Sequence, residues 1–133
     1  MPLLLLAIAL LVRLYYAVDG HFGFDDMHYA KLSAQVADGV FQTNGDHYTF
    51  RWGLIALNGL VYALLGISDY TSAIVPMLAT LATAALVWRM GAGLSWAARF
   101  FAVFFTGFSE WVFFYSTKIM PDILVMFSIT AAM

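Results

Sequence analysis

The chain has 133 residues, of which 63% are hydrophobic and 11% are charged, and its mean hydropathy is +0.85. Soluble domains average about 45–50% apolar and about 25% charged residues, so this composition predicts an integral membrane protein. The net charge of −2, without any basic run, argues against nucleic acid as a partner. The sequence contains no cysteine, which excludes disulfides, zinc–thiolate sites and cysteine nucleophiles within it.

The first apolar run predicts a transmembrane helix over residues 1–18. A cleaved signal peptide is the weaker interpretation, because no basic residue precedes the run and no small-x-small cleavage motif follows it. Arg13 interrupts this run about one turn from its far end. Its side chain is expected either to snorkel to the membrane interface or to contact an anionic headgroup or lipid phosphate.

A long polar stretch, residues 19–51, follows. Within it, Asp25–Asp38 is predicted to form a short amphipathic helix along the membrane surface, because apolar residues recur at helical spacing. Aspartates 25 and 26 in its first turn suit the helix dipole, and Gly39 is a stop signal.

Further apolar runs complete an expected all-α, polytopic membrane protein. It has about three to four transmembrane helices and amphipathic juxtamembrane helices in its first external loop, residues 19–70. After residues 1–18, the transmembrane helices are expected at 71–88, 99–117 and 122–133. The last run stops before the roughly 20 residues that a span needs. We therefore expect the chain, 1–133, to be the N-terminal part of a larger transmembrane domain, inactive when isolated.

Charge predicts the topology. Arg89 and Arg99 flank a short connection that the positive-inside rule assigns to the cytoplasm. Counting membrane crossings from a cytoplasmic N-terminus agrees with this assignment only if the short run 52–67 does not cross the membrane. Asp25, Asp26 and residues 116–122 are then expected on the same outer face.

Three aspartates on this face are candidate catalytic residues: Asp25, Asp26 and Asp122. Their carboxylates are hard ligands that suit Mg²⁺ or Mn²⁺, with Asp25 and Asp122 as the candidate pair. Alternatively, one carboxylate acts as a general base. The competing interpretation is structural, because carboxylates also cap helix starts.

Three cations are candidate ligands for a lipid phosphate: Arg13, Arg51 and Lys118. His28 and His47 are better interpreted as polar surface residues than as ligands. Glu110 lies inside an aromatic run, where a carboxylate needs a partner or a polar cleft. Pairing with Lys118 and exposure to such a cleft both remain open for it.

The ordered set of these features resembles the N-terminal part of a GT-C membrane glycosyltransferase, the superfamily that includes protein O-mannosyltransferases and aminoarabinose transferases. The features are "LVRLYY", "FDDMHYAKLSAQVADG", "RWGLIALNGLVYALLGISDYTSAIVP" and "FFYSTKIMPDILVMF", and together they cover nearly the whole chain. The chain departs from the family pattern at Glu110, where relatives often have Ser-Pro, and at Lys118, which stands close to the family's arginine. The polar stretch around His47 also lacks the Lys-Pro-Pro or His-Pro-Pro signature.

The resemblance implies transfer of a sugar from a polyprenyl-phosphate carrier to an acceptor hydroxyl on a lipid, glycan or protein, usually with inversion. Asp25 then matches the first-loop aspartate, Asp26 its acidic neighbour and Asp122 the second-loop acid. A divalent metal is a possible cofactor. The expected location is a bacterial inner membrane, with the site facing the periplasm or exterior and a role in the cell envelope. The alternative is a non-enzymatic transporter or lipid flippase, in which Glu110 and Arg13 line a pathway.

Overall fold

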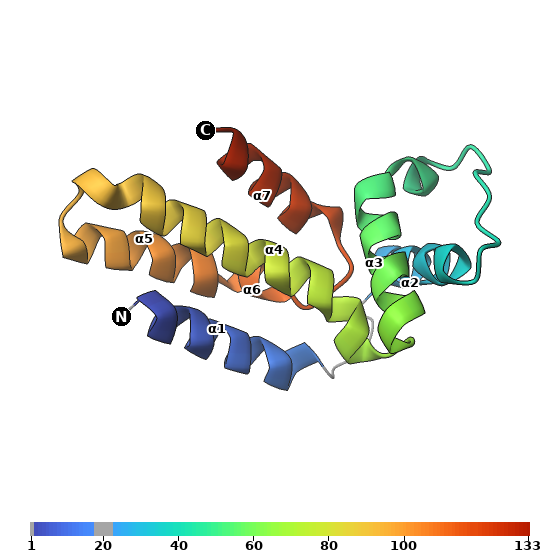
Figure 1. Ribbon diagram of the computed structural model, residues 1–133, viewed down its shortest axis with the longest axis horizontal. Helices are drawn as coiled ribbons and strands as arrows, with labels where there is room; N and C mark the ends of the chain where they lie inside the picture. The colour runs from blue at the N-terminus through green and yellow to red at the C-terminus, as the bar shows by residue number, and fades with distance from the viewer. Residues whose placement is uncertain (1, 18–22) are drawn as a thin grey trace.

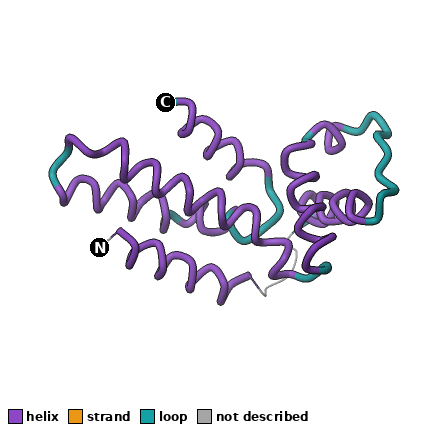
Figure 2. The backbone as a smooth tube through the Cα atoms, viewed as in Figure 1, coloured by secondary structure: helices purple, strands orange, loops and turns teal. Residues whose placement is uncertain are grey.

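The computed structural model describes residues 2–17 and 23–133 of the chain (Figure 1). Among these residues it contains helices and their connections, with no strand (Figure 2), so the predicted all-α class is confirmed. The end of the first predicted transmembrane helix, at residue 18, and residues 19–22 of the predicted external loop lie outside the described residues.

A bundle of helices surrounds α4 (Asp69–Met90). Helices α1 (Pro2–Tyr16), α5 (Trp96–Phe108) and α7 (Pro121–Ala132) all pack against it (Figure 1). The buried face of α4 is rich in small residues, which allow close helix approach: Ala73, Ala79, Thr80, Thr83 and Ala84. The chain order makes α1 and α4 run in opposite directions along the bundle, and α4 and α5 likewise (Figure 1).

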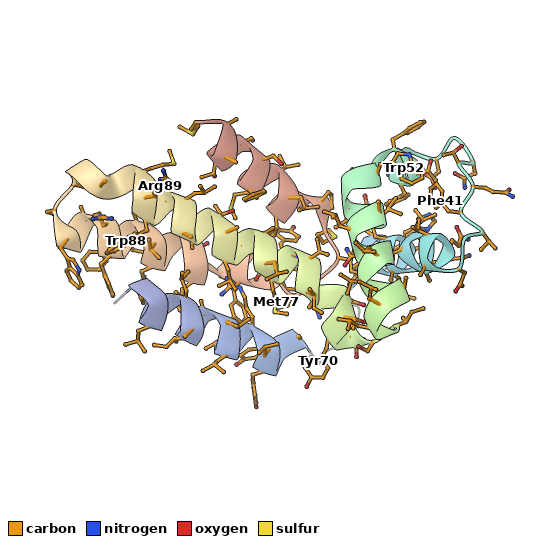
Figure 3. All side chains as sticks on the ribbon, viewed as in Figure 1. Phe41, Trp52, Tyr70, Met77, Trp88 and Arg89 are labelled. Carbon is orange, nitrogen blue, oxygen red and sulfur yellow. The ribbon has the colours of Figure 1, made fainter. Side chains whose placement is uncertain are left out.

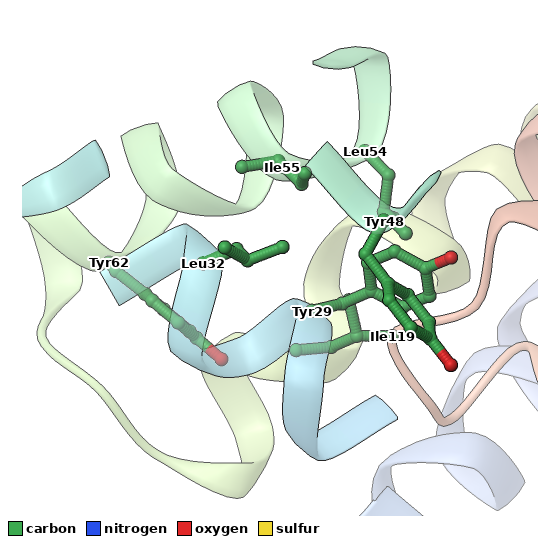
Figure 4. Packing of buried hydrophobic residues seen from close by; sticks show 7 residues of the cluster. All are labelled: Tyr29, Leu32, Tyr48, Leu54, Ile55, Tyr62 and Ile119. Atoms are coloured by element: carbon green, nitrogen blue, oxygen red, sulfur yellow. The ribbon is translucent and has the colours of Figure 1, made fainter. Parts of the chain in front are cut away.

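A second group of elements, here called the end unit, lies at the end of the bundle where α1 finishes and α4 begins (Figure 1). It consists of α2 (Phe24–Ala37), the 3₁₀ turn η2 (His47–Phe50) and α3 (Trp52–Leu65). Helix α3 runs across the direction of α4 in this view rather than alongside it. The buried core of the end unit contains Tyr29, Leu32, Tyr48, Leu54, Ile55, Tyr62 and Ile119 (Figure 4).

The connection between α2 and α3 runs back along the length of α2. Tyr29 lies under the Arg51 guanidinium, and further along both helices Gly59 lies against Val36, so contacts follow the same order on α2 and α3. The chain must therefore return from the end of α2 to the level of Tyr29, about 12 Å at 1.5 Å per residue. Phe41 packs on Trp52 during this return, with ring centroids 4.5 Å apart (Figure 3).

The predicted single helix over 99–117 is wrong. Helix α5 ends at Phe108, Ser109 has an extended ψ of 141°, and a short helix, α6 (Glu110–Tyr115), begins anew. Serine favours helix starts over helix interiors, and Gly107 two residues earlier weakens the preceding helix. Glu110 is therefore an exposed first-turn residue of α6, not a carboxylate within a continuous span.

Among the described residues, one helical stretch, Asp69–Gly93, is long and apolar enough to cross a membrane by length and composition. Shorter apolar helices occupy Leu4–Tyr16, Trp52–Leu65, Trp96–Phe108 and Pro121–Ala132. The predicted number of transmembrane helices thus stays a prediction, and only the helical class beneath it is established.

Candidate functional site

A cavity of about 220 Å³ lies between the end unit and the connection from α6 to α7. The start of α2 contributes Gly23, Phe24, Asp25 and Asp26, whereas Phe114, Lys118 and Met120 come from α6 and the following connection. Two carboxylates and one ammonium group therefore line the same space. Segments that lie far apart in the sequence meet here because α4 and α5, which come between them in the chain, traverse the bundle in opposite directions.

The adjacent aspartates, Asp25 and Asp26, have different hydrogen-bond partners. Asp26 is buried, and its Oδ1 accepts a hydrogen bond of 3.0 Å from the backbone N–H of Gly23. This bond satisfies an N–H group just ahead of the first turn of α2, which is the second half of a capping box. The structural interpretation of the aspartate pair therefore describes Asp26 well.

Asp25 points to a different partner. Its Oδ1 accepts a hydrogen bond from the hydroxyl of Tyr48, a residue of η2. This hydrogen bond is the main cause of a raised pKa of the Tyr48 hydroxyl; burial of the ring and the negative charges of Asp25 and Asp46 act in the same direction. Asp25 is partly exposed and lines the cavity, so it remains accessible to a ligand there.

Lys118 reaches the cavity from the connection that precedes α7. Its neighbour Ile119 is completely buried in the core of the end unit, which anchors this connection against α2 and η2 (Figure 4). Lys118 itself is 6% exposed, so its ammonium group acts in a largely dehydrated environment. An ammonium group so placed favours an anionic ligand more strongly than one in open solvent.

Asp122 does not line this cavity. It is an exposed first-turn residue of α7, directly after Pro121 at the start of the helix, as its structural interpretation requires. Within residues 2–17 and 23–133, no group of three or more histidine, cysteine or acidic side chains is arranged so that it could hold a metal ion. The predicted metal pair of Asp25 and Asp122 therefore gains no support from this arrangement, and the metal stays an untested prediction.

Arg13 occupies a position that neither expectation described. Its side chain is fully buried between helices: Nε donates to Ser116 Oγ at 2.7 Å, and the terminal nitrogens donate to the carbonyls of Ala9 and Gly107. It also lies over the ring of Phe113, 5.3 Å from its centroid. With its donors directed at protein acceptors, Arg13 does not snorkel and joins α1 to α5 and α6.

Arg51 remains exposed and lies beside the site. Its guanidinium is 5.4 Å from the ring centroid of Tyr29 and 6.0 Å from that of Tyr48. It also borders an open groove of about 300 Å³ between the start of α3 and one face of α7. The rest of the groove lining is mostly apolar: Gly53, Leu54, Pro121, Leu124, Val125, Ser128 and Ile129. Arg51 thus lies at the edge of a mostly apolar groove.

His28 and His47 flank the ring of Tyr48. Asp46 contacts His47 at 2.9 Å and His28 at 3.6 Å, and both imidazoles lie beside the Tyr48 ring. Sequence reasoning missed Tyr48 because no local pattern shows that the connection runs back to the start of α2. The aspartate before η2 was the available signal, since Asp46 caps this turn.

Comparison with protein families, curated proteins and solved structures finds no match to the chain. The resemblance to GT-C glycosyltransferases therefore stays an expectation from the sequence motifs.

Proposed function

We propose that the chain carries part of the active site of a membrane glycosyltransferase. The transferred sugar comes from a polyprenyl-phosphate carrier, and the acceptor is a hydroxyl group on the extracytoplasmic side. The observation that carries the proposal is the cavity in which Asp25 and Lys118 meet. It combines an accessible carboxylate with a dehydrated ammonium group, as proton removal and phosphate binding require.

The surroundings of the cavity suit a lipid-linked substrate. Large apolar side chains are exposed on the bundle helices, including Leu11 on α1, Leu78 on α4, Phe105 on α5 and Ile129 on α7. Apolar faces of this extent favour a lipid environment. The groove beside Arg51 adds an apolar channel with a cation at its edge, a combination that fits a lipid tail and its phosphate.

The chemistry divides between the two charges. Asp25 accepts the proton of the acceptor hydroxyl while the hydroxyl oxygen forms a bond to C1 of the sugar. The bond between C1 and the carrier phosphate breaks on the opposite face, which inverts the configuration. Lys118 and Arg51 offset the charge of the departing lipid phosphate. Asp26 keeps the first turn of α2 in place and does not take part in proton transfer.

The test is turnover by the full-length protein in proteoliposomes. The probes are radiolabelled undecaprenyl-phosphate sugars, assayed as a panel for loss of label from the undecaprenyl-phosphate carrier. Asp25→Asn should lower turnover by about 10²–10⁴-fold, the usual contribution of a general base. Asp38→Asn is the matched control, because Asp38 is an exposed aspartate at the opposite end of α2. Near-normal turnover by Asp25→Asn would contradict the proposal.

The transporter alternative makes the opposite prediction. Glu110→Gln should then be the damaging change and Asp25→Asn nearly silent, with lipid or solute movement as the readout. Glu110 is an exposed residue at the start of α6, so its replacement leaves the cavity lining unaltered. The pair of variants therefore separates the two functions in one set of proteoliposomes.

A further inference from the structure

The hydrogen bond between Tyr48 and Asp25 joins η2 to the first turn of α2. We propose that Tyr48 is a positioning residue for Asp25, holding one carboxylate oxygen so that the other is directed to the acceptor hydroxyl. This inference rests on the proposed function. The hydroxyl of Tyr48 occupies Oδ1 of Asp25, and no described residue forms a hydrogen bond to Oδ2.

The ring of Tyr48 is held from several sides. It lies edge-on to Tyr29, with centroids 5.3 Å apart, and is flanked by His28 at 4.5 Å and His47 at 4.0 Å. Phe24 adds a more distant edge contact at 6.4 Å. With only 9% of its surface exposed, the ring has little room to change rotamer. The hydroxyl is therefore presented in one place.

The backbone beneath Tyr48 is fixed as well. Asp46 Oδ1 accepts a hydrogen bond of 3.3 Å from the Tyr48 N–H, and the Asp46 carbonyl accepts one of 2.7 Å from the hydroxyl of Thr49. Thr49 is fully buried. Because η2 is capped and packed in this way, ordering the Asp25 carboxylate requires no further ordering of Tyr48.

A first-turn aspartate on a helix ordinarily samples several rotamers. A base that is already oriented avoids this loss of freedom in the transition state, and displacement by about 1 Å can cost about 10²-fold in rate. Tyr48→Phe keeps the ring and removes only the donor. We therefore expect kcat to fall by about 10- to 100-fold, with little change in KM for the lipid-linked sugar.

Tyr29→Phe is the matched control. The Tyr29 hydroxyl is buried and has no hydrogen-bond partner among the described residues, although its ring contacts Tyr48. Its removal should leave kcat unchanged. Binding of undecaprenyl phosphate should remain close to wild type and both variants should stay folded at the assay temperature, which separates positioning from a purely structural role.

The outcomes are distinct when these variants are assayed together with Asp25→Asn on the same panel of undecaprenyl-phosphate sugars. Loss of kcat in Tyr48→Phe, with no additional loss in the double variant with Asp25→Asn, supports positioning through Asp25. Wild-type kcat in Tyr48→Phe while Asp25→Asn is inactive overturns the role of Tyr48 alone. A rise in KM or a loss of folding at unchanged kcat overturns it too. Normal turnover by Asp25→Asn overturns both this inference and the proposed function.

Discussion

The end unit and the helix bundle use polar groups in opposite ways. In the bundle, buried hydroxyls turn back onto their own helix, as Thr80 Oγ1 does to the Pro76 carbonyl and Thr83 Oγ1 to the Ala79 carbonyl. In the end unit, polar side chains reach across elements, and the contact between Tyr48 and Asp25 is the clearest case. Arg13 and Arg99 are exceptions in the bundle: Arg13 links helices far apart in sequence, and Arg99 on α5 donates to the carbonyl of Trp88 on α4.

This difference separates scaffold from site. In the proposed membrane setting a helix bundle gains little from polar groups, which fits hydroxyls satisfied within their own helix and packing through small residues. At the end unit, Asp25, Asp26 and Lys118 line one cavity, and Tyr48 binds the carboxylate of Asp25. Substitutions of side chains that link separate elements should therefore have large effects on stability or activity. Substitutions of side chains with only local contacts should have small ones.

Arg13 offers the largest expected effect on stability. Arg13→Lys keeps a buried charge but lacks the planar fork that reaches three acceptors. It should lower the free energy of unfolding by about 3 kcal/mol, whereas Arg13→Met, which removes the charge, should cost about 1–2 kcal/mol. Unfolding in mixed SDS–detergent micelles measures both. Arg89→Lys, at an exposed position, is the control, and equal stability of all three would contradict this account of Arg13.

Gly59 tests the packing within the end unit. A Cβ at this position would lie 2.6 Å from Cγ1 of Val36 and 3.1 Å from the carbonyl oxygen of Ser33. Because a β-branched side chain and a helix backbone have little room to move, Gly59→Ala should lower the free energy of unfolding by about 1–3 kcal/mol. Gly53→Ala on the same helix meets nothing within 4 Å and should be neutral or slightly stabilising. The same unfolding assay compares them, and a stabilised Gly59→Ala variant would refute the close approach of α2 and α3.

Asn58 tests whether a buried polar side chain of the end unit contributes to stability. It is fully buried, and neither its amide nitrogen nor its oxygen has a hydrogen-bond partner among the described residues. Asn58→Leu removes both stranded groups at similar volume, so it should be neutral or stabilise by up to about 1 kcal/mol. A loss well beyond this size in thermal unfolding would show that the amide has a partner in the folded protein.

The smallest expected effect concerns alkaline pH. Because the pKa of Tyr48 is raised in the folded protein, its contribution to stability is complete below the ordinary tyrosine value of about 10. It is lost as pH rises from there through the raised value. Tyr48→Phe should abolish this part of the alkaline loss, measured as the thermal midpoint between pH 9 and 11.

The sequence predicted the elements better than their contacts. The first helix of the end unit was expected at residues 25–38 and is found at Phe24–Ala37, because aspartates and Gly39 mark its ends locally. The break at Ser109 was missed because the aromatic run around it is continuous in hydropathy. Its local signal was the Gly-Phe-Ser sequence that precedes Glu110.

Site residues were predictable only as far as their partners were local. Asp26 forms its cap with Gly23, three residues away, and the capping interpretation anticipated it. Arg13 binds Ser116 and Gly107, and Asp25 binds Tyr48, so their positions depend on how the helices return. The pattern of hydropathy along the chain does not show which helices pack against one another.

The most direct test of the account is the side of the membrane on which each end of α4 lies. Because the chain has no cysteine, single cysteines can be introduced at exposed positions 42, 93 and 122 and treated in intact cells with a membrane-impermeant maleimide. The account predicts labelling at 42 and 122 from outside, and at 93 only after permeabilisation. Labelling of 42 and 93 from the same side would contradict it, because the cavity of Asp25 and Lys118 would then not face outward across a membrane-spanning α4.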